Sequence, residues 1–214
     1  MLTDNAVSIT RKVTLERETA PSAEAHLHAS RRVDWRFLLP NPNLGRVAYV
    51  GVGQGELINS LRLFSNSLTV LASPEVGKEA DYDVVVAHDP ESALLPAMTQ
   101  LVSPGGYLYV ELYGTTWWLR KGKYRGFRQP AKYVAQLRRS GLSDIHSYWQ
   151  WPNFEACTRV IPLDCPSSLR FVLSLRRDSA VDQVKAMAVE GLIRSGLLDW
   201  LVPCFSLIAQ RVKS

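Results

Sequence analysis

The stretch VAYVGVGQGEL, residues 47–57, decides the fold of this chain. An apolar run ends here in three glycines at alternate positions, Gly51, Gly53 and Gly55, and apolar residues then recur at helical spacing as far as Phe64. The order is strand, glycine turn, helix. Glycines leave space for a ligand close to the backbone, and the N–H groups at a helix N-terminus favour an anion or a carboxylate. The stretch therefore predicts a ligand site at the end of a buried strand.

Further strands and helices alternate along the chain. The uninterrupted valines of residues 83–87 suit a parallel strand that is covered on both faces. Other strands are expected at 46–50, 68–71, 107–112, 145–151 and 205–212, helices at 21–32, 57–64, 92–102, 130–140 and most of 181–201, and a turn at 103–106. Residues 152–168 are expected to be irregular, and 169–175 fit either a strand or a helix.

This alternation predicts an α/β fold with a doubly wound, mostly parallel sheet. The predicted organisation is an N-terminal extension and helix (1–32), a Rossmann-like domain (33–151 and 203–214) and a partly helical insertion (152–202). Ligands of such sheets bind at the carboxyl ends of the strands. We therefore expect residues 51–56, 72–75, 88–91 and 113–128 to converge on one cleft.

Composition narrows the class of protein. Apolar residues make up 46% of the 214 residues, enough for a sizeable core. The three cysteines are scattered, which argues against a disulfide framework and a zinc site. No leader and no run of about 18 apolar residues is present, so a cytoplasmic protein is expected.

Positive charge is concentrated in one region. The net charge is +5, yet eight of the 25 basic residues lie between Leu112 and Ser143, where no acidic residue occurs. The remainder of the chain holds 17 basic and 20 acidic residues and is slightly acidic. This distribution favours a local site for an anion over a surface that coats nucleic acid.

Three segments together resemble the class I S-adenosylmethionine (SAM)-dependent methyltransferases: VAYVGVGQGEL (47–57), YDVVVAHDP (82–90) and LVSPGGYLYVEL (101–112), in the family's order and spacing. The resemblance covers roughly residues 30–151 and the last ten. It implies SAM as cofactor, methyl transfer to a small acceptor, and no metal. The cofactor-binding residues that it implies, with the nearest substitutes, are Gly51, Gly53, Gly55, Glu56, Ala72, Ser73 and Glu75. The dinucleotide pattern G-x-G-x-x-G is absent, because its third glycine would fall at Glu56.

The chain departs from the family at two positions. Tyr49 replaces an acid that usually precedes the first glycine by two places, and Ala72 replaces the acid that usually binds the ribose. The stretch 72–82 is also too short for the usual helix, strand and helix, so the sheet is expected to lack about one strand. These departures support a second hypothesis, a catalytically degenerate methyltransferase fold that acts as a scaffold or binds a partner protein.

Two side chains directly after the third strand are the catalytic candidates. His88 or Asp89 would remove a proton from a hydroxyl or amine acceptor. The alternative for Asp89 is that it caps the following helix together with Pro90. Glu111 lies near the end of the next strand, and we expect it to form a salt bridge with neighbouring basic residues.

A basic and aromatic region follows the fourth strand. Its candidate substrate-binding residues are Trp117, Arg120, Lys121, Lys123 and Arg125. We favour a lid over an anionic acceptor, such as a phosphorylated molecule, because this loop leaves a strand beside the cofactor site. The alternatives are a peripheral membrane contact, a surface for nucleic acid over residues 117–139, and an ordinary solvated loop.

The nucleic-acid and membrane alternatives make a prediction about salt. Because neutralised phosphates release counterions, affinity for a labelled RNA or an anionic vesicle should fall by about tenfold or more between roughly 50 and 200 mM salt. Binding that ignores the salt concentration would exclude both alternatives.

Overall fold

The computed structural model describes residues 22–51, 53, 55–74, 81–114, 130–173, 190–192, 195 and 201–213. Seven strands form one sheet in the order β2-β1-β3-β4-β7-β5-β6. They are β1 (Arg46–Val50), β2 (Ser67–Leu71), β3 (Tyr82–His88), β4 (Val102–Tyr113), β5 (Leu142–Trp151), β6 (Arg159–Pro162) and β7 (Cys204–Arg211). The helices are α1 (Ala23–Arg32), α2 (Gly55–Phe64), α3 (Leu95–Leu101), α5 (Pro130–Arg139) and α6 (Pro166–Leu173), with short 3-10 turns η1 (Asp34–Leu38) and η3 (Ser92–Leu94).

The sheet is mixed in direction. Strands β2, β1, β3 and β4 are parallel, whereas β7 is antiparallel to both β4 and β5, and β6 is antiparallel to β5. The predicted doubly wound α/β fold is therefore confirmed. The parallel half brings the carboxyl ends of four strands to one edge.

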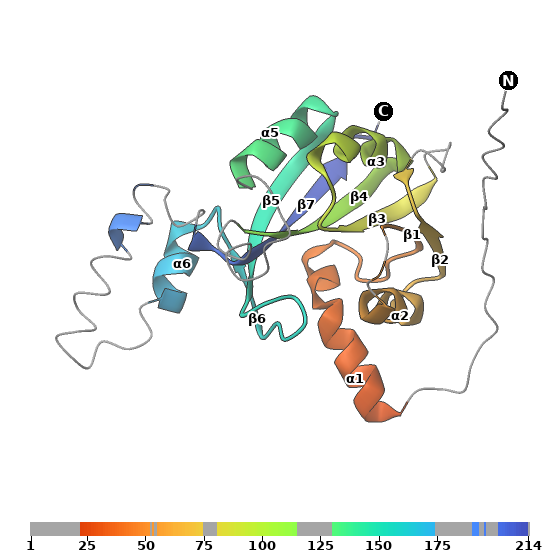
Figure 1. The fold of residues 1–214 in the computed structure, drawn as a ribbon, viewed down its shortest axis with the longest axis horizontal. Coiled ribbons are helices and arrows are strands. Elements are labelled where there is room, and N and C mark those ends of the chain that lie inside the picture. Colours follow the sequence, from red (N-terminus) through yellow and green to blue (C-terminus); the bar gives the residue numbers. More distant parts are fainter. Residues whose placement is uncertain are drawn as a thin grey trace, which may run out of the picture.

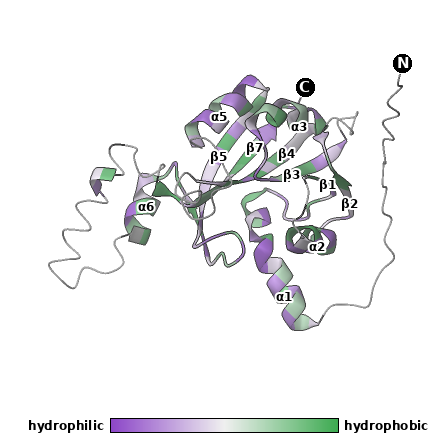
Figure 2. Cartoon of the chain, viewed as in Figure 1, coloured by the Kyte–Doolittle hydropathy of each residue, from purple (hydrophilic) through white to green (hydrophobic). Residues whose placement is uncertain are grey.

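Helices cover both faces of the sheet (Figure 1). Helix α2 and turn η1 pack on the face that presents Val47, Tyr49 and Tyr109, and α1 lies against α2 on the same side. Helices α3 and α5 pack on the other face, around Val85 and Val110. Figure 2 shows hydrophobic strands between these layers, whereas α1 is largely hydrophilic.

The predicted strands and helices that fall on described residues are found within a few residues of their expected bounds, with two corrections. Most of the helix predicted at 181–201 lies outside the described residues. Residues 103–106, expected as a turn, are part of β4, where the register with β3 shifts between Tyr82 and Val84. Gly105 lies in this bulge at φ +82°, a backbone conformation that suits glycine. A bulge and a turn favour the same residues, glycine among them, which explains why this part of β4 was predicted as a turn.

The second correction concerns the segment after β5. Within residues 152–168, expected to be irregular, β6 extends the sheet by pairing with β5 from Tyr148 to Trp151. Residues 169–175, left open between strand and helix, begin within α6. A four-residue strand carries too short a period to be read from sequence.

The expected loss of a strand is confirmed in the described residues. Strand β2 forms the edge of the sheet beside β1, and the chain reaches β3 by Tyr82. None of the described helices combines the length and the apolar composition that crossing a membrane requires.

A histidine on β5 lies between two carboxylates. Nδ1 of His146 is 2.8 Å from Asp164 Oδ2, and Nε2 is 3.0 Å from Asp144 Oδ1. Chiefly through the hydrogen bond with Asp164, these contacts raise the pKa of His146 above its ordinary value.

Replacing both carboxylates (Asp144→Asn with Asp164→Asn) should lower the free energy of unfolding at about pH 5.5 but not at about pH 9. A histidine whose pKa is higher in the folded than in the unfolded protein stabilises the folded state fully at pH values below its unfolded pKa of about 6.5. This stabilisation is lost as pH rises through the folded-state pKa. The side chains are about half exposed, so the difference should stay below about 1 kcal/mol. Urea unfolding at both pH values measures it. Asparagine also tolerates the φ of 46° at Asp144, and an equal loss at both pH values would contradict the expectation.

Candidate functional site

The predicted cleft segments converge where they are described. The N–H of Gly51 donates to the carbonyl of Leu71 at the end of β2, at 2.9 Å, and His88 at the end of β3 lies beside Glu111 of β4. The carboxyl ends of β2, β1, β3 and β4 therefore form one edge, as the parallel register requires.

The glycine turn is open. A side-chain Cβ at Gly53 or Gly55 would meet no atom within 4 Å among the described residues. Gly53 has φ +91°, which side chains rarely adopt. The turn leads into α2, whose first N–H groups lack helical partners. The backbone here can approach a ligand closely.

Tyr49 fills the space beneath the first glycine. Its ring is buried, and a Cβ placed on Gly51 would lie 3.5 Å from the phenol oxygen. Burial, together with the negative charge of Glu111, raises the pKa of Tyr49 to about 12. The phenol is therefore neutral at physiological pH and supplies no negative charge in place of the family's usual acid.

The other predicted cofactor residues lie around this edge. Ala72 is exposed and Ser73 half-buried after β2. Glu56 is in the first turn of α2, where it lies 3.3 Å from Nδ1 of His28. Glu75 and the substrate-binding candidates Trp117, Arg120, Lys121, Lys123 and Arg125 lie outside the described residues.

A buried ion pair lies at the centre of the site. Arg32, the last residue of α1, donates from Nη1 and Nη2 to the two oxygens of Glu111 at 2.5 and 2.6 Å. The side chains are 3% and 0% exposed. The expected salt bridge of Glu111 is confirmed, but its partner comes from 79 residues away rather than from the adjacent basic segment.

Two further groups hydrogen-bond to the same carboxylate. The hydroxyl of Tyr109 donates to Oε1 at 3.1 Å, and Nδ1 of His88 lies 2.7 Å from Oε2. Burial alone would raise the pKa of Glu111, but Arg32 and His88 outweigh it and lower the pKa to about 2. Burial and the neighbouring carboxylate raise the pKa of Tyr109 well above its ordinary value.

His88 is held in one orientation by this arrangement. Its ring packs edge-on against Tyr113 and Phe154, with centroid distances of 5.4 and 5.9 Å. A carboxylate at Nδ1 favours the N–H on that nitrogen and leaves Nε2 as the proton acceptor. His88 therefore has the arrangement of a general base supported by a carboxylate.

Asp89 follows in a left-handed backbone conformation, φ 50°. Its N–H donates to the carbonyl of Glu111 at 2.7 Å. Such a conformation outside glycine costs on the order of 1 kcal/mol or more and is frequent at functional sites. The residue before turn η3 is Glu91, whose side chain makes no capping hydrogen bond.

Arg32 and Tyr109 are site residues that the sequence reasoning did not single out, whereas Tyr49 was noted there as a departure from the family pattern. Arg32 is one of two consecutive arginines at a helix end, a pattern that is common on solvated helices. Only the tertiary fold shows that it is buried.

Within the described residues, no group of three or more His, Cys, Asp or Glu side chains is arranged to hold a metal ion.

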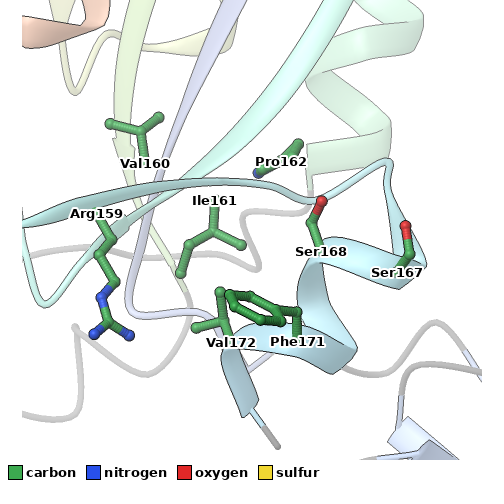
Figure 3. Close-up of a pocket in the computed structure, with 8 residues that line it drawn as sticks. All are labelled: Arg159, Val160, Ile161, Pro162, Ser167, Ser168, Phe171 and Val172. Carbon is green, nitrogen blue, oxygen red and sulfur yellow. The ribbon is translucent and has the colours of Figure 1, made fainter. Parts of the chain in front are cut away.

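Two cavities lie near β6. A groove of about 520 Å³ runs between β6 and α6, where Phe171 and Val172 face Ile161 (Figure 3). A smaller cavity of about 70 Å³ lies on the α1 face of the sheet, between η1 and the β5–β6 hairpin. The smaller cavity touches Arg32 and Phe154, which also surround the site of His88.

Several solved structures have a similar fold. A SAM-dependent methyltransferase from Archaeoglobus fulgidus is 14% identical, with a TM-score of 0.57 over 86% of this chain and 94% of that one. A SAM-dependent methyltransferase from Thermotoga maritima is 13% identical, with a TM-score of 0.50 over 88% and 92%. This chain therefore has the fold of the class I SAM-dependent methyltransferases, as a divergent example.

Phosphoethanolamine N-methyltransferase 2 of Haemonchus contortus, solved with S-adenosyl-L-methionine, is 13% identical with a TM-score of 0.49. The alignment covers 90% of this chain but 53% of that protein, so this chain spans about half the length of that methyltransferase. No protein-family model and no curated protein matches the sequence.

Arg32→Met should lower the free energy of unfolding by about 3–5 kcal/mol, because it leaves the Glu111 carboxylate buried and unpaired. Replacing both partners, Arg32→Met with Glu111→Leu, should restore most of this loss. Denaturant unfolding near pH 7 measures both variants. The matched control is Arg62→Met, since Arg62 is exposed on α2 and its loss should stay within about 0.5 kcal/mol. Equal losses for Arg32→Met and the control would contradict a buried pair.

Proposed function

We propose that this protein is a SAM-dependent methyltransferase that acts on a small, anionic acceptor. The observation that carries the proposal is the open glycine turn at the carboxyl edge of β1, two strands away from Glu111, which orients His88. In the class I fold this edge is where ligands of the parallel sheet bind.

The residues present fit the cofactor at the glycine end. Gly53 and Gly55 leave open space, and the N-terminus of α2 suits the carboxylate of the methionine part. Ala72 is exposed, so its own side chain leaves room for a nucleoside, while a ribose contact falls to Ser73 or Glu75. A missing hydrogen bond to the ribose costs on the order of 1–3 kcal/mol, which weakens cofactor binding without abolishing it.

When bound, SAM supplies an electrophilic methyl group on a sulfonium. The chain's own residues would prepare the acceptor. His88 takes the proton from a hydroxyl or amine at Nε2, while Glu111 orients the ring and stabilises its protonated form. Arg32 keeps that carboxylate ionised. Asp89, one residue further, is the second candidate for contact with the acceptor.

The anionic character of the acceptor rests on the basic region 117–139. We assign Trp117 and the four basic candidates that follow it to acceptor binding. The H. contortus neighbour is itself named for a phosphorylated amine. The free thiols Cys157, Cys165 and Cys204 agree with the reducing cytoplasm that the proposal assumes.

The alternative remains a degenerate methyltransferase fold that binds a partner. The buried Tyr49 and the missing acid at Ala72 favour it, because both remove groups that hold the cofactor in the family. Titration with SAM distinguishes the two functions, because a protein that does not bind SAM supports the scaffold function.

We expect isothermal titration to detect SAM or S-adenosylhomocysteine binding, and Gly53→Leu to abolish it. A leucine at φ +91° both strains the turn and fills the open space beside α2. Gly141→Leu is the matched control: Gly141 has φ +88°, also with no atom within 4 Å, but it follows α5 away from the site. The control should suffer similar strain and keep binding. No heat for the unmodified protein at millimolar ligand would reject the proposed function.

A further inference from the structure

We propose that the cavity between η1 and the β5–β6 hairpin binds the anionic group of the acceptor, a carboxylate or a phosphate. As an acceptor subsite the inference rests on the proposed function, but its test needs no cofactor. The lining residues are Arg31, Arg32, Asp34, Trp35, Tyr109, Gln150, Phe154, Cys157, Thr158, Arg159 and Val160.

The cavity has a buried floor and a solvated rim. Its floor is formed by side chains from distant parts of the chain, each at most 5% exposed: Arg32, Trp35, Tyr109, Gln150 and Phe154. Trp35 stacks on Tyr109 with ring centroids 3.8 Å apart and nearly parallel planes, which fixes the floor. The rim carries the exposed side chains of Arg31, Thr158 and Arg159.

The charge of the lining is positive. Arg32 is neutralised by Glu111, and Asp34 lies 3.7 Å from Arg36. Within the described part of the chain, the guanidinium groups of Arg31 and Arg159 have no carboxylate within salt-bridge distance. Two positive charges on one rim raise the local concentration of anions.

The hydrogen-bonding groups of the cavity also favour an acceptor-only ligand. The amide oxygen of Gln150 accepts from Cys157, and its nitrogen donates to Ser206. Arg32 has five N–H donors, of which Glu111 takes two. The lining thus offers the exposed guanidinium groups of Arg31 and Arg159 as further donors, and Asp34 is the one carboxylate among its residues. Oxyanions match this pattern, since they accept and do not donate.

Its volume limits the ligand to one small group. About 70 Å³ equals the share of roughly two liquid waters, enough for a single carboxylate or phosphate but not for a nucleoside. The cavity adjoins the catalytic candidates, because Arg32 and His88 share Glu111 and the ring of Phe154 lies against His88. An acceptor anchored here by its anionic end would lie one side-chain layer, that of Phe154, from His88.

Titration with inorganic phosphate, followed by two-dimensional NMR of the indole N–H signals, tests this assignment. Trp35 lies in the floor, so its signal, assigned with Trp35→Phe, should shift saturably as phosphate is added. Arg159→Gln should weaken phosphate binding by about tenfold, because it removes a charge-assisted hydrogen bond. Arg62→Gln, an exposed arginine of α2 outside the cavity, should leave the affinity unchanged.

Phosphate protection of Cys157 from alkylation, measured in Cys165→Ser, gives a second readout if Trp35→Phe does not fold. The affinity for acetate, measured at the same ionic strength, then identifies the anionic group of the acceptor. Tighter binding of phosphate assigns a phosphate group, and tighter binding of acetate assigns a carboxylate. No saturable shift and no protection would overturn the subsite, as would equal weakening by Arg159→Gln and Arg62→Gln. Phosphate binding without any SAM binding would keep the anion site and reject the methyltransferase.

Discussion

The ion pair between Arg32 and Glu111 is the constraint on which the rest of the site depends. Arg32 is the one buried residue of α1, and its guanidinium reaches the only charged side chain among the core positions of β4. A buried charge is tolerated only with a close partner. The helix is therefore held to the sheet by electrostatics at this point rather than by an apolar face.

This pair joins the fold to the chemistry. The same carboxylate that anchors α1 orients His88 and accepts from Tyr109, so the position of the N-terminal helix and the orientation of the candidate base cannot change independently. Pairs of this kind add little net stability compared with apolar packing. A buried ion pair of this kind is better suited to fixing the relative positions of side chains. The candidate base His88 and the proposed acceptor subsite both require such fixed positions.

The site differs from the pattern of the class I methyltransferases in where negative charge lies. The glycine turn is open, but a neutral phenol at Tyr49 and a methyl group at Ala72 stand where acids usually hold the cofactor. The buried carboxylate of this edge is Glu111, and Arg32 already neutralises it. Cofactor binding would thus depend on backbone N–H groups and shape more than on charge, whereas the proposed acceptor subsite is lined by three arginines.

Local pattern alone determined the glycine turn, the parallel strands and the shortened sheet. Three glycines at alternate positions, Gly51, Gly53 and Gly55, indicate a turn, and the uninterrupted valines of β3 indicate a strand that is buried on both faces. Neighbouring residues in the sequence suffice for both inferences. Helix α5 could also be predicted from the sequence, since Pro130 marks its start and Gly141 its end.

Only the tertiary structure decided which charges meet. Arg32 has the sequence context of an ordinary solvated helix end, and its partner lies 79 residues away. The arginine-lined cavity likewise exists only because the fold brings η1 and the β5–β6 hairpin together. The periodicity of apolar residues indicates which face of a segment is buried. An ion pair depends instead on one side chain from each of two distant segments, and no local sequence pattern carries that information.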